Sequence, residues 1–290
     1  MFDNIFAAIE KWMRELLTGM VESNMSTMFT DVNEKTSEIA AQVGRTPQNW
    51  NSSVFSMIQN LSESVVVPIA GIIITLVLCY ELISMLTERN NLHDVDTWMF
   101  FKYFVKAWVA IYLVSNTFTI TMAVLDVGQS VVNSASGIIN GETAIDVSSL
   151  SMQMQAAMAT MEIGELVVLA LETFLVSFCM KIMSVVITVI VYGRMIEIYL
   201  YTSLAPIPFA TMSNREWGHV GTNYFRGLFA LAFQAFLMMV CVAIYAALIS
   251  SVRISSNMHS ALIGVAAYTV ILCFSLMKTG SLSKQIFGSH

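Results

Sequence analysis

The longest apolar run in the chain extends from Gly164 to Tyr192 and contains only three ionisable residues, Glu165, Glu172 and Lys181. As a helix rising about 1.5 Å per residue, the run would be roughly 40 Å long, which exceeds the roughly 30 Å hydrocarbon core of a bilayer. A soluble domain has no need for such a segment. The run therefore predicts a membrane protein.

The composition supports a membrane protein and gives little support to an enzyme. Hydrophobic residues make up 56% of the 290 residues and charged residues only 12%, whereas soluble domains carry about 25% charged residues. The sequence has no glycine-rich phosphate loop, no HExxH and no GxSxG, and its histidines are isolated from one another. Its cysteines are far apart inside apolar stretches, so we interpret them as packing residues and expect no catalytic residue, metal or cofactor. These cysteines are Cys79, Cys179, Cys241 and Cys273.

Further apolar stretches predict an all-α, polytopic membrane helix bundle with about five transmembrane helices. The stretches lie at 64–86, 107–125, 164–192 with its continuation, 224–250 and 258–277. On this basis the chain has four segments. They are an external N-terminal arm (1–63), the first two spans (64–125), an external loop with short amphipathic helices (126–162), and a core bundle with a short cytoplasmic tail (163–290).

The external segments carry apolar stripes. Residues 1–20 place apolar side chains at helical spacing on one face, which predicts an amphipathic helix. This helix either lies in the membrane interface or on a partner, or it docks on the protein's own bundle. Residues 21–63 are polar and predict a mostly helical, solvated arm. The stripes at 1–20, 131–139 and 150–161 are candidate contacts between subunits.

The basic residues indicate the orientation. With five spans and an external N-terminus, eight Lys and Arg residues face the inside and five the outside. The loop 126–162 contains no Lys or Arg, as the positive-inside rule requires of an external loop. The sequence therefore predicts an external N-terminus and an internal C-terminus.

The continuation of the central run contains a predicted helix break. Pro206 and Pro208, which follow Ala205, remove two backbone donors and end the helix, favouring a break or a re-entrant segment. Just before it, Arg194 and Glu197 are three residues apart and are predicted to pair on one helix.

The run from Arg194 through Ala205-Pro206-Ile207-Pro208-Phe209, the short polar link with Trp217, and the apolar span that follows resemble the TrbL-type family. Members are polytopic inner-membrane subunits of conjugative type IV secretion systems. The chain is similar to the compact form found in elements of Gram-positive hosts. The resemblance implies an external N-terminus, five spans, a large external loop after the second span and an internal C-terminus.

Two interpretations remain open for the charged residues of the central run. Glu165, Glu172, Lys181, Arg194 and Glu197 either line a lumen or bridge subunits, or they form buried pairs between helices. Lys181 lies near the middle of the run, where a lone ammonium is costly, and is predicted to have a buried partner. Trp217 is placed at the membrane interface.

The leading hypothesis is a non-enzymatic channel or scaffold subunit of a conjugative secretion machine in the bacterial cytoplasmic membrane. Its expected partners are further copies of itself, separate secretion ATPases, other membrane subunits and the lipid bilayer, with DNA only as transient cargo. The alternative is a self-contained transporter or ion channel with a site at Glu172 and Lys181. A membrane anchor or holin-like protein is a third, weaker hypothesis.

Overall fold

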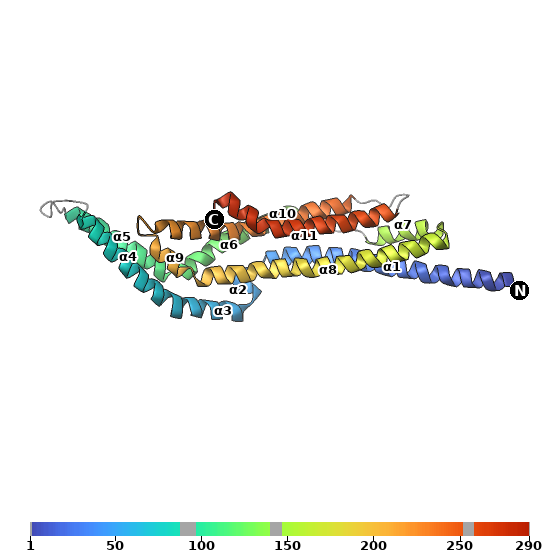
Figure 1. The fold of residues 1–290 in the computed structure, drawn as a ribbon, viewed down its shortest axis with the longest axis horizontal. Helices are drawn as coiled ribbons and strands as arrows, with labels where there is room; N and C mark the ends of the chain where they lie inside the picture. Colours follow the sequence, from blue (N-terminus) through green and yellow to red (C-terminus); the bar gives the residue numbers. More distant parts are fainter. Residues whose placement is uncertain (1, 88–96, 140–146, 252–257, 290) are drawn as a thin grey trace. The chain divides into compact units, whose positions relative to one another are not determined.

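The computed structural model describes residues 2–87, 97–139, 147–251 and 258–289. Within these ranges the chain is helical and contains no strand, which confirms the predicted all-α fold (Figure 1). Five helical runs in the described residues are long and apolar enough to cross a membrane, as the sequence predicts. They are Ser52–Thr87, Trp98–Ser115, Ile163–Ser203, Gly218–Ser250 and Met258–Phe287.

The chain divides into two compact units, each built from three separate stretches. Unit 1 comprises 1–43, 134–191 and 238–278, and unit 2 comprises 44–133, 192–237 and 279–290. The helices that contribute to both units are α6 (Thr117–Ile139), α8 (Ile163–Ser203), α10 (Gly218–Ser250) and α11 (Met258–Phe287).

In unit 1, helix α1 (Phe2–Val43) packs against α7 (Val147–Ala159) and runs beside the first part of α8 (Figure 1). The prediction that 21–43 belongs to a solvated arm is wrong. Apolar side chains at helical spacing, hidden in the sequence among Ser, Thr and Glu residues, form a buried stripe on α1. The stripe consists of Val21, Met25, Met28, Phe29, Val32, Ile39 and Val43.

The first part of α1 differs from the rest, because its apolar side chains are exposed. Ile5, Phe6, Ile9, Trp12, Met13, Leu16 and Met20 each expose at least a third of their surface. In contrast, Met154 and Met158 of α7 are buried, as is Val132 of α6. Two of the three stripes predicted to contact other subunits are therefore covered, at least in part, within the chain itself.

Unit 2 begins with short helices, α2 (Pro47–Trp50) and α3 (Ser52–Leu61). Thr46 caps the first, accepting a hydrogen bond from the Asn49 backbone N–H at 3.3 Å, and Asn51 caps the second through Val54 at 3.1 Å. From α3 the chain continues through a π-helical turn, η1 (Ser62–Val66), into α4 (Val67–Thr87). Pro68, the second residue of α4, lies inside this continuous helical run. The wide π turn before it relieves the clash between a proline ring and the preceding turn.

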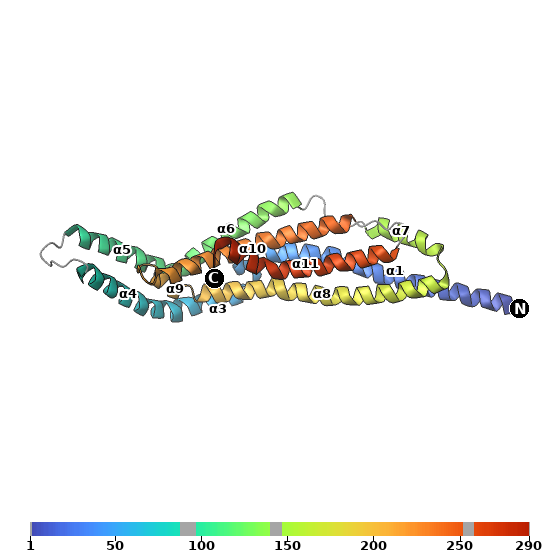
Figure 2. The ribbon, with the colours of Figure 1, turned by 45° about the horizontal axis from the view of Figure 1, so that its top comes forward.

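The second span lies earlier than the expected 107–125, because α5 (Thr97–Ser115) and α6 meet at Asn116. The helical hydrogen bonds continue through this joint, from Asn116 N–H to Tyr112 and from Ile120 N–H to Asn116. The Thr117 and Thr121 hydroxyls bond carbonyls one turn back, which commonly bends a helix. Helices α4 and α5 form an antiparallel pair (Figure 2).

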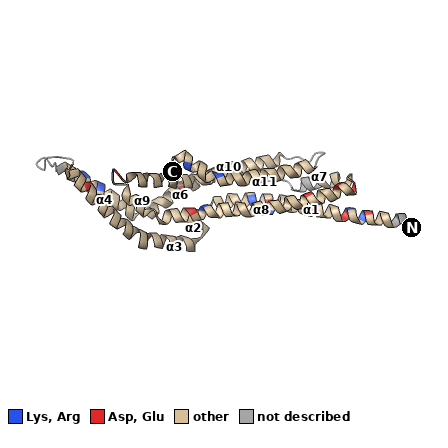
Figure 3. Ribbon diagram, in the orientation of Figure 1, with Lys and Arg blue, Asp and Glu red and all other residues tan. Residues whose placement is uncertain are grey.

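The core of unit 2 forms where α4 and α5 pack around a short helix, α9 (Pro206–Thr211). Small residues let α9 approach closely, since Ala205 and Ala210 are fully buried between the larger side chains of Ile74, Val114 and Phe209. Charged residues are sparse along α8, α10 and α11, which are drawn almost entirely in tan in Figure 3.

Candidate functional site

The predicted helix break lies between α8, which ends at Ser203, and α9, which begins at Pro206. The backbone turns rather than unwinds, because Ala205 N–H bonds Thr202 at 3.3 Å and Ile207 N–H bonds Leu204 at 3.2 Å. Pro206 occupies the first helical position, where a missing N–H leaves no hydrogen bond unmade. The break is therefore packed in protein, with Pro206 and Phe209 buried.

Arg194 of α8 is buried, with 7% of its surface exposed, and its Nη2 donates to the Leu231 carbonyl of α10 at 3.4 Å. Its Nε contacts no hydrogen-bond acceptor among the described residues. Burying an arginine with one carbonyl partner is unfavourable. Arg194 therefore joins α8 to α10 at a cost in desolvation.

The predicted pair between Arg194 and Glu197 is wrong. Glu197 instead forms an ion pair with Lys284 of α11, with 3.0 Å between Nζ and Oε1. Spacing of three residues allows a pair on a helix surface. Here the two side chains point to different neighbours, because Arg194 lies on the buried face of α8 and Glu197 on its half-exposed face.

Glu172 contacts another helix, whereas Glu165 acts within its own helix. The Glu172 carboxylate hydrogen-bonds His259 Nδ1, which joins α8 to α11 in unit 1. Glu165 accepts the Glu162 backbone N–H at 3.1 Å and so caps the start of α8. The sequence gives no sign of the His259 contact, since the two residues are 87 positions apart.

The buried partner predicted for Lys181 is absent from the part of the chain that the structure describes. Lys181 is exposed on α8 and makes no hydrogen bond or ion pair with any residue that the structure describes. Neighbouring polar residues continue along the same side of α8, since Thr173 and Ser177 are buried and Ser184 and Thr188 half-buried. Their spacing of three to four residues places this polar seam on one side of the helix.

Trp217 lies in the short link between α9 and α10 and is 45% exposed. Its ring stacks on that of Tyr80 of α4, with 5.8 Å between centroids. The Tyr80 hydroxyl lies 3.0 Å from each carboxylate oxygen of Glu216. Asn214 Oδ1 accepts the backbone N–H groups of Glu216 and Trp217 at 2.7 and 3.0 Å and so stabilises the turn that precedes α10. The link is therefore an ordered contact with α4.

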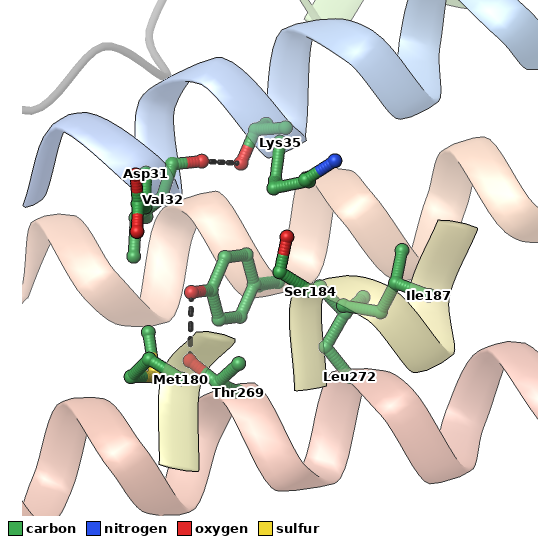
Figure 4. A pocket seen from close by; sticks show the side chains of 10 residues that line it. Asp31, Val32, Lys35, Met180, Ser184, Ile187, Thr269 and Leu272 are labelled. Carbon is green, nitrogen blue, oxygen red and sulfur yellow. Dashed lines mark hydrogen bonds between the residues drawn. The ribbon is translucent and has the colours of Figure 1, made fainter. Parts of the chain in front are cut away.

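Unit 1 contains a small cavity with a mixed polar and apolar lining that the sequence analysis did not predict. It is about 20 Å³, room for roughly one water molecule. Asp31, Val32 and Lys35 of α1 lie opposite Ser184 of α8 and Thr269 of α11 (Figure 4). The hydroxyls of Tyr245 and Thr269 share a hydrogen bond of 2.9 Å at its wall. The spacing of Asp31 and Lys35 on one helix face was its only sign in the sequence.

Polar groups of α1 also bind neighbouring helices directly. Lys35 Nζ donates to the Thr188 hydroxyl at 3.2 Å and pairs with Glu38. Arg14 Nη1 donates to the Met158 carbonyl at 3.5 Å. Arg14 therefore contacts α7, just before α8 begins, and Lys35 contacts α8 further along, so α1 and the first part of α8 run in the same direction (Figure 1).

Among the predicted site residues, Glu172, Arg194 and Glu197 join helices and Glu165 caps one, whereas Lys181 contacts no described partner. Glu172 and Lys181, the proposed ion site of a self-contained transporter, do not contact each other: Glu172 bonds His259, and Lys181 is exposed. The arrangement supports assembly and positioning of membrane helices.

Comparison with known proteins gives one match. A family model described as "TrbL/VirB6 plasmid conjugal transfer like protein" matches residues 32–206, which is more than half of the chain. The matched region runs from the polar part of α1 to the first proline of α9 and contains the whole of α8. No curated protein and no solved structure matches the chain.

Proposed function

Because this chain belongs to the TrbL/VirB6 plasmid conjugal transfer-like family, we propose that it is a non-enzymatic membrane subunit of a conjugative type IV secretion system. The observation that carries the proposal is the family match over residues 32–206, which coincides with a chain bearing five apolar helices. The subunit would scaffold the platform in the bacterial cytoplasmic membrane and line or gate part of the route for a protein–DNA substrate.

We further propose that the subunit forms homo-oligomers. The exposed apolar side chains between Ile5 and Met20 support this proposal, since a row of large apolar residues on one helix face favours contact with protein or lipid. Other membrane subunits of the same machine are the second class of partner. Energy for transfer would come from separate ATPases at the inner face, to which the internal C-terminus would be accessible.

DNA passes such a subunit only as transient cargo. Strong binding to DNA depends on Lys and Arg contacts with phosphates, because neutralising phosphates releases counterions. The chain has only 14 Lys and Arg residues against 20 Asp and Glu, and a net charge of −6. In addition, Lys35, Lys106 and Lys284 are engaged in ion pairs. An oligomer of this chain would therefore surround DNA without holding it.

The test uses the gene in its own conjugative element. Deleting it should abolish DNA transfer, and supplying the chain in trans should restore it. The protein purified in mild detergent should have an oligomeric mass and should leave labelled single-stranded DNA unbound at moderate salt. Transfer at the wild-type frequency without the gene would refute a role in conjugation. A strict monomer, or tight DNA binding with a steep salt dependence, would refute the proposed assembly and cargo path.

A further inference from the structure

The two long helices of unit 1 expose opposite kinds of surface. Large apolar side chains are exposed along α8 from Val167 to Leu200. From Val21 to Val43, in contrast, the exposed positions of α1 carry one alanine and otherwise hydroxyl or carboxylate side chains. These polar residues, which we call the α1 polar stripe, are Ser23, Ser26, Thr27, Thr30, Glu34 and Ser37.

The α1 polar stripe lies at the depth of the hydrocarbon core. Crossing this core takes about 20 residues, and every such stretch within Val167–Leu200 includes residues 181–186 of α8. Ser184 lines the cavity together with Asp31 and Lys35 of α1, and Lys35 bonds Thr188. Residues 31–35 of α1 are therefore level with residues 184–188 of α8, near the middle of the apolar run that can lie in the membrane.

Two exposed charged groups of unit 1 require water or another polar environment. Glu34 is exposed in the α1 polar stripe, and its carboxylate has no partner among the described residues. Lys181 is exposed and also without a described partner, and it lies on the polar seam of α8 that continues to Thr188, the contact of Lys35. Facing hydrocarbon would be costly for either group. The hydroxyl groups alone would not require water, since Thr27 satisfies its own by bonding the Ser23 carbonyl at 2.8 Å.

We propose that the α1 polar stripe and Lys181 face a water-filled passage at membrane depth, while the apolar face of α8 contacts lipid. The inference rests on the proposed function, because a passage requires several copies of unit 1, or other subunits, around it. The proposal assigns the wall of this passage to α1 and not to the apolar helices. By composition, α1 is too polar to be a membrane span.

Cysteine reactivity distinguishes water from lipid, because only the thiolate reacts and it forms in water. The four native cysteines are first replaced by alanine, and DNA transfer is checked. Single cysteines then replace Thr30 and Ser37 in the stripe, Met28 on the buried face of α1, and Val185 on the apolar face of α8. Membranes with both sides accessible are treated with a charged, membrane-impermeant methanethiosulfonate.

The expected result is that Thr30→Cys and Ser37→Cys react at least about tenfold faster than Val185→Cys and Met28→Cys, since only the first two thiols ionise freely. Reaction at Thr30→Cys as slow as at Val185→Cys overturns the inference. Should slow labelling at Thr30→Cys accompany oxidative cross-linking between copies, the stripe is a subunit contact instead. The deletion experiment tests the proposed function separately. If the stripe positions are labelled but the element transfers DNA without the gene, the role in conjugation is refuted and the water-filled passage is retained.

Discussion

Tyr201 of α8 and Tyr224 of α10 bond each other's backbone across the helix break. The Tyr201 hydroxyl donates to the Tyr224 carbonyl at 3.2 Å, and the Tyr224 hydroxyl donates to the Tyr201 carbonyl at 2.8 Å. Their rings stack with 4.5 Å between centroids. The Tyr224 hydroxyl therefore satisfies a carbonyl in the last turn of α8, and the pair joins the end of α8 to the start of α10.

This reciprocal pair predicts a graded response at Tyr224. Tyr224→Phe keeps the ring stack and loses one hydrogen bond, which should lower the free energy of unfolding by about 0.5–1.5 kcal/mol. Tyr224→Ala also leaves a cavity beside Phe209 and should cost about 3–5 kcal/mol. Thermal unfolding in detergent measures both. Tyr112→Phe, on an exposed part of α5, is the control, and a Tyr224→Phe variant no less stable than this control would contradict the prediction.

A close crossing of α6 and α10 depends on Gly128. A Cβ at this position would lie 2.6 Å from the Ala232 carbonyl oxygen, which belongs to the backbone of α10 and cannot move aside. Gly128→Ala should therefore destabilise unit 2 by about 1–3 kcal/mol through overpacking. At Gly71 of α4, an added Cβ would meet nothing within 4 Å, so Gly71→Ala should be neutral or stabilise the helix by roughly 0.5–1 kcal/mol. Equal stability of the two variants would argue against the crossing.

The ion pair between Glu81 of α4 and Lys106 of α5 predicts rescue by exchange. The Glu81 side chain is only 16% exposed, so Lys106→Met leaves a largely buried carboxylate unpaired and should cost about 1–3 kcal/mol. Exchanging the charges, with Glu81→Lys and Lys106→Glu together, should recover part of this loss. Protein yield and thermal unfolding of the single variants and the exchange variant test the pair. An exchange variant less stable than both single variants would contradict it.

The membrane spans were predictable, because apolar length is a property of each segment alone. Five candidate spans and the break before Pro206 could be recognised without any tertiary contact. Contacts between distant segments could not. The sequence places Arg194 beside Glu197, yet the structure pairs Glu197 with Lys284 and buries Arg194 against Leu231, because the packing of α10 and α11 decides which neighbour each side chain meets.

Helix α1 shows a second limit. Its polar composition between Val21 and Val43 predicted a solvated arm, and the buried stripe of Met25, Met28 and Phe29 was overlooked. Composition averages the two faces of a helix, whereas burial depends on one face only. For the same reason, composition does not reveal the α1 polar stripe. The stripe indicates a water-facing surface only once the packing of α1 beside α8 shows that the two helices lie at the same depth in the membrane.

The orientation of the chain in the membrane remains a prediction. The structure offers better labelling positions to test it than the middle of the two loops at 87–106 and 126–162. From the sequence alone, Asn90 in the loop after the first span and Ser148 in the loop 126–162 would be the labelling positions, but Asn90 and the side chain of Ser148 lie outside the described residues. Met152, in the segment without Lys or Arg, is 66% exposed, and Arg215, in the link before α10, is also exposed. In a cysteine-free background, an impermeant reagent added to intact cells should label Met152→Cys and spare Arg215→Cys, because basic links stay inside. The reverse pattern would invert the topology.

Lys181 and Lys106 are both cations on apolar helices, but only Lys106 has a partner among the described residues. Lys181→Met removes an exposed ammonium that has no described partner, so the free energy of unfolding should change by no more than about 0.5 kcal/mol. Lys106→Met is the matched comparison and should be clearly destabilising. Any defect of Lys181→Met should therefore concern assembly or DNA transfer, measured as oligomer mass and conjugation frequency at equal protein amount. If Lys181→Met unfolds as readily as Lys106→Met, Lys181 stabilises the isolated chain and is not a residue of the water-facing wall.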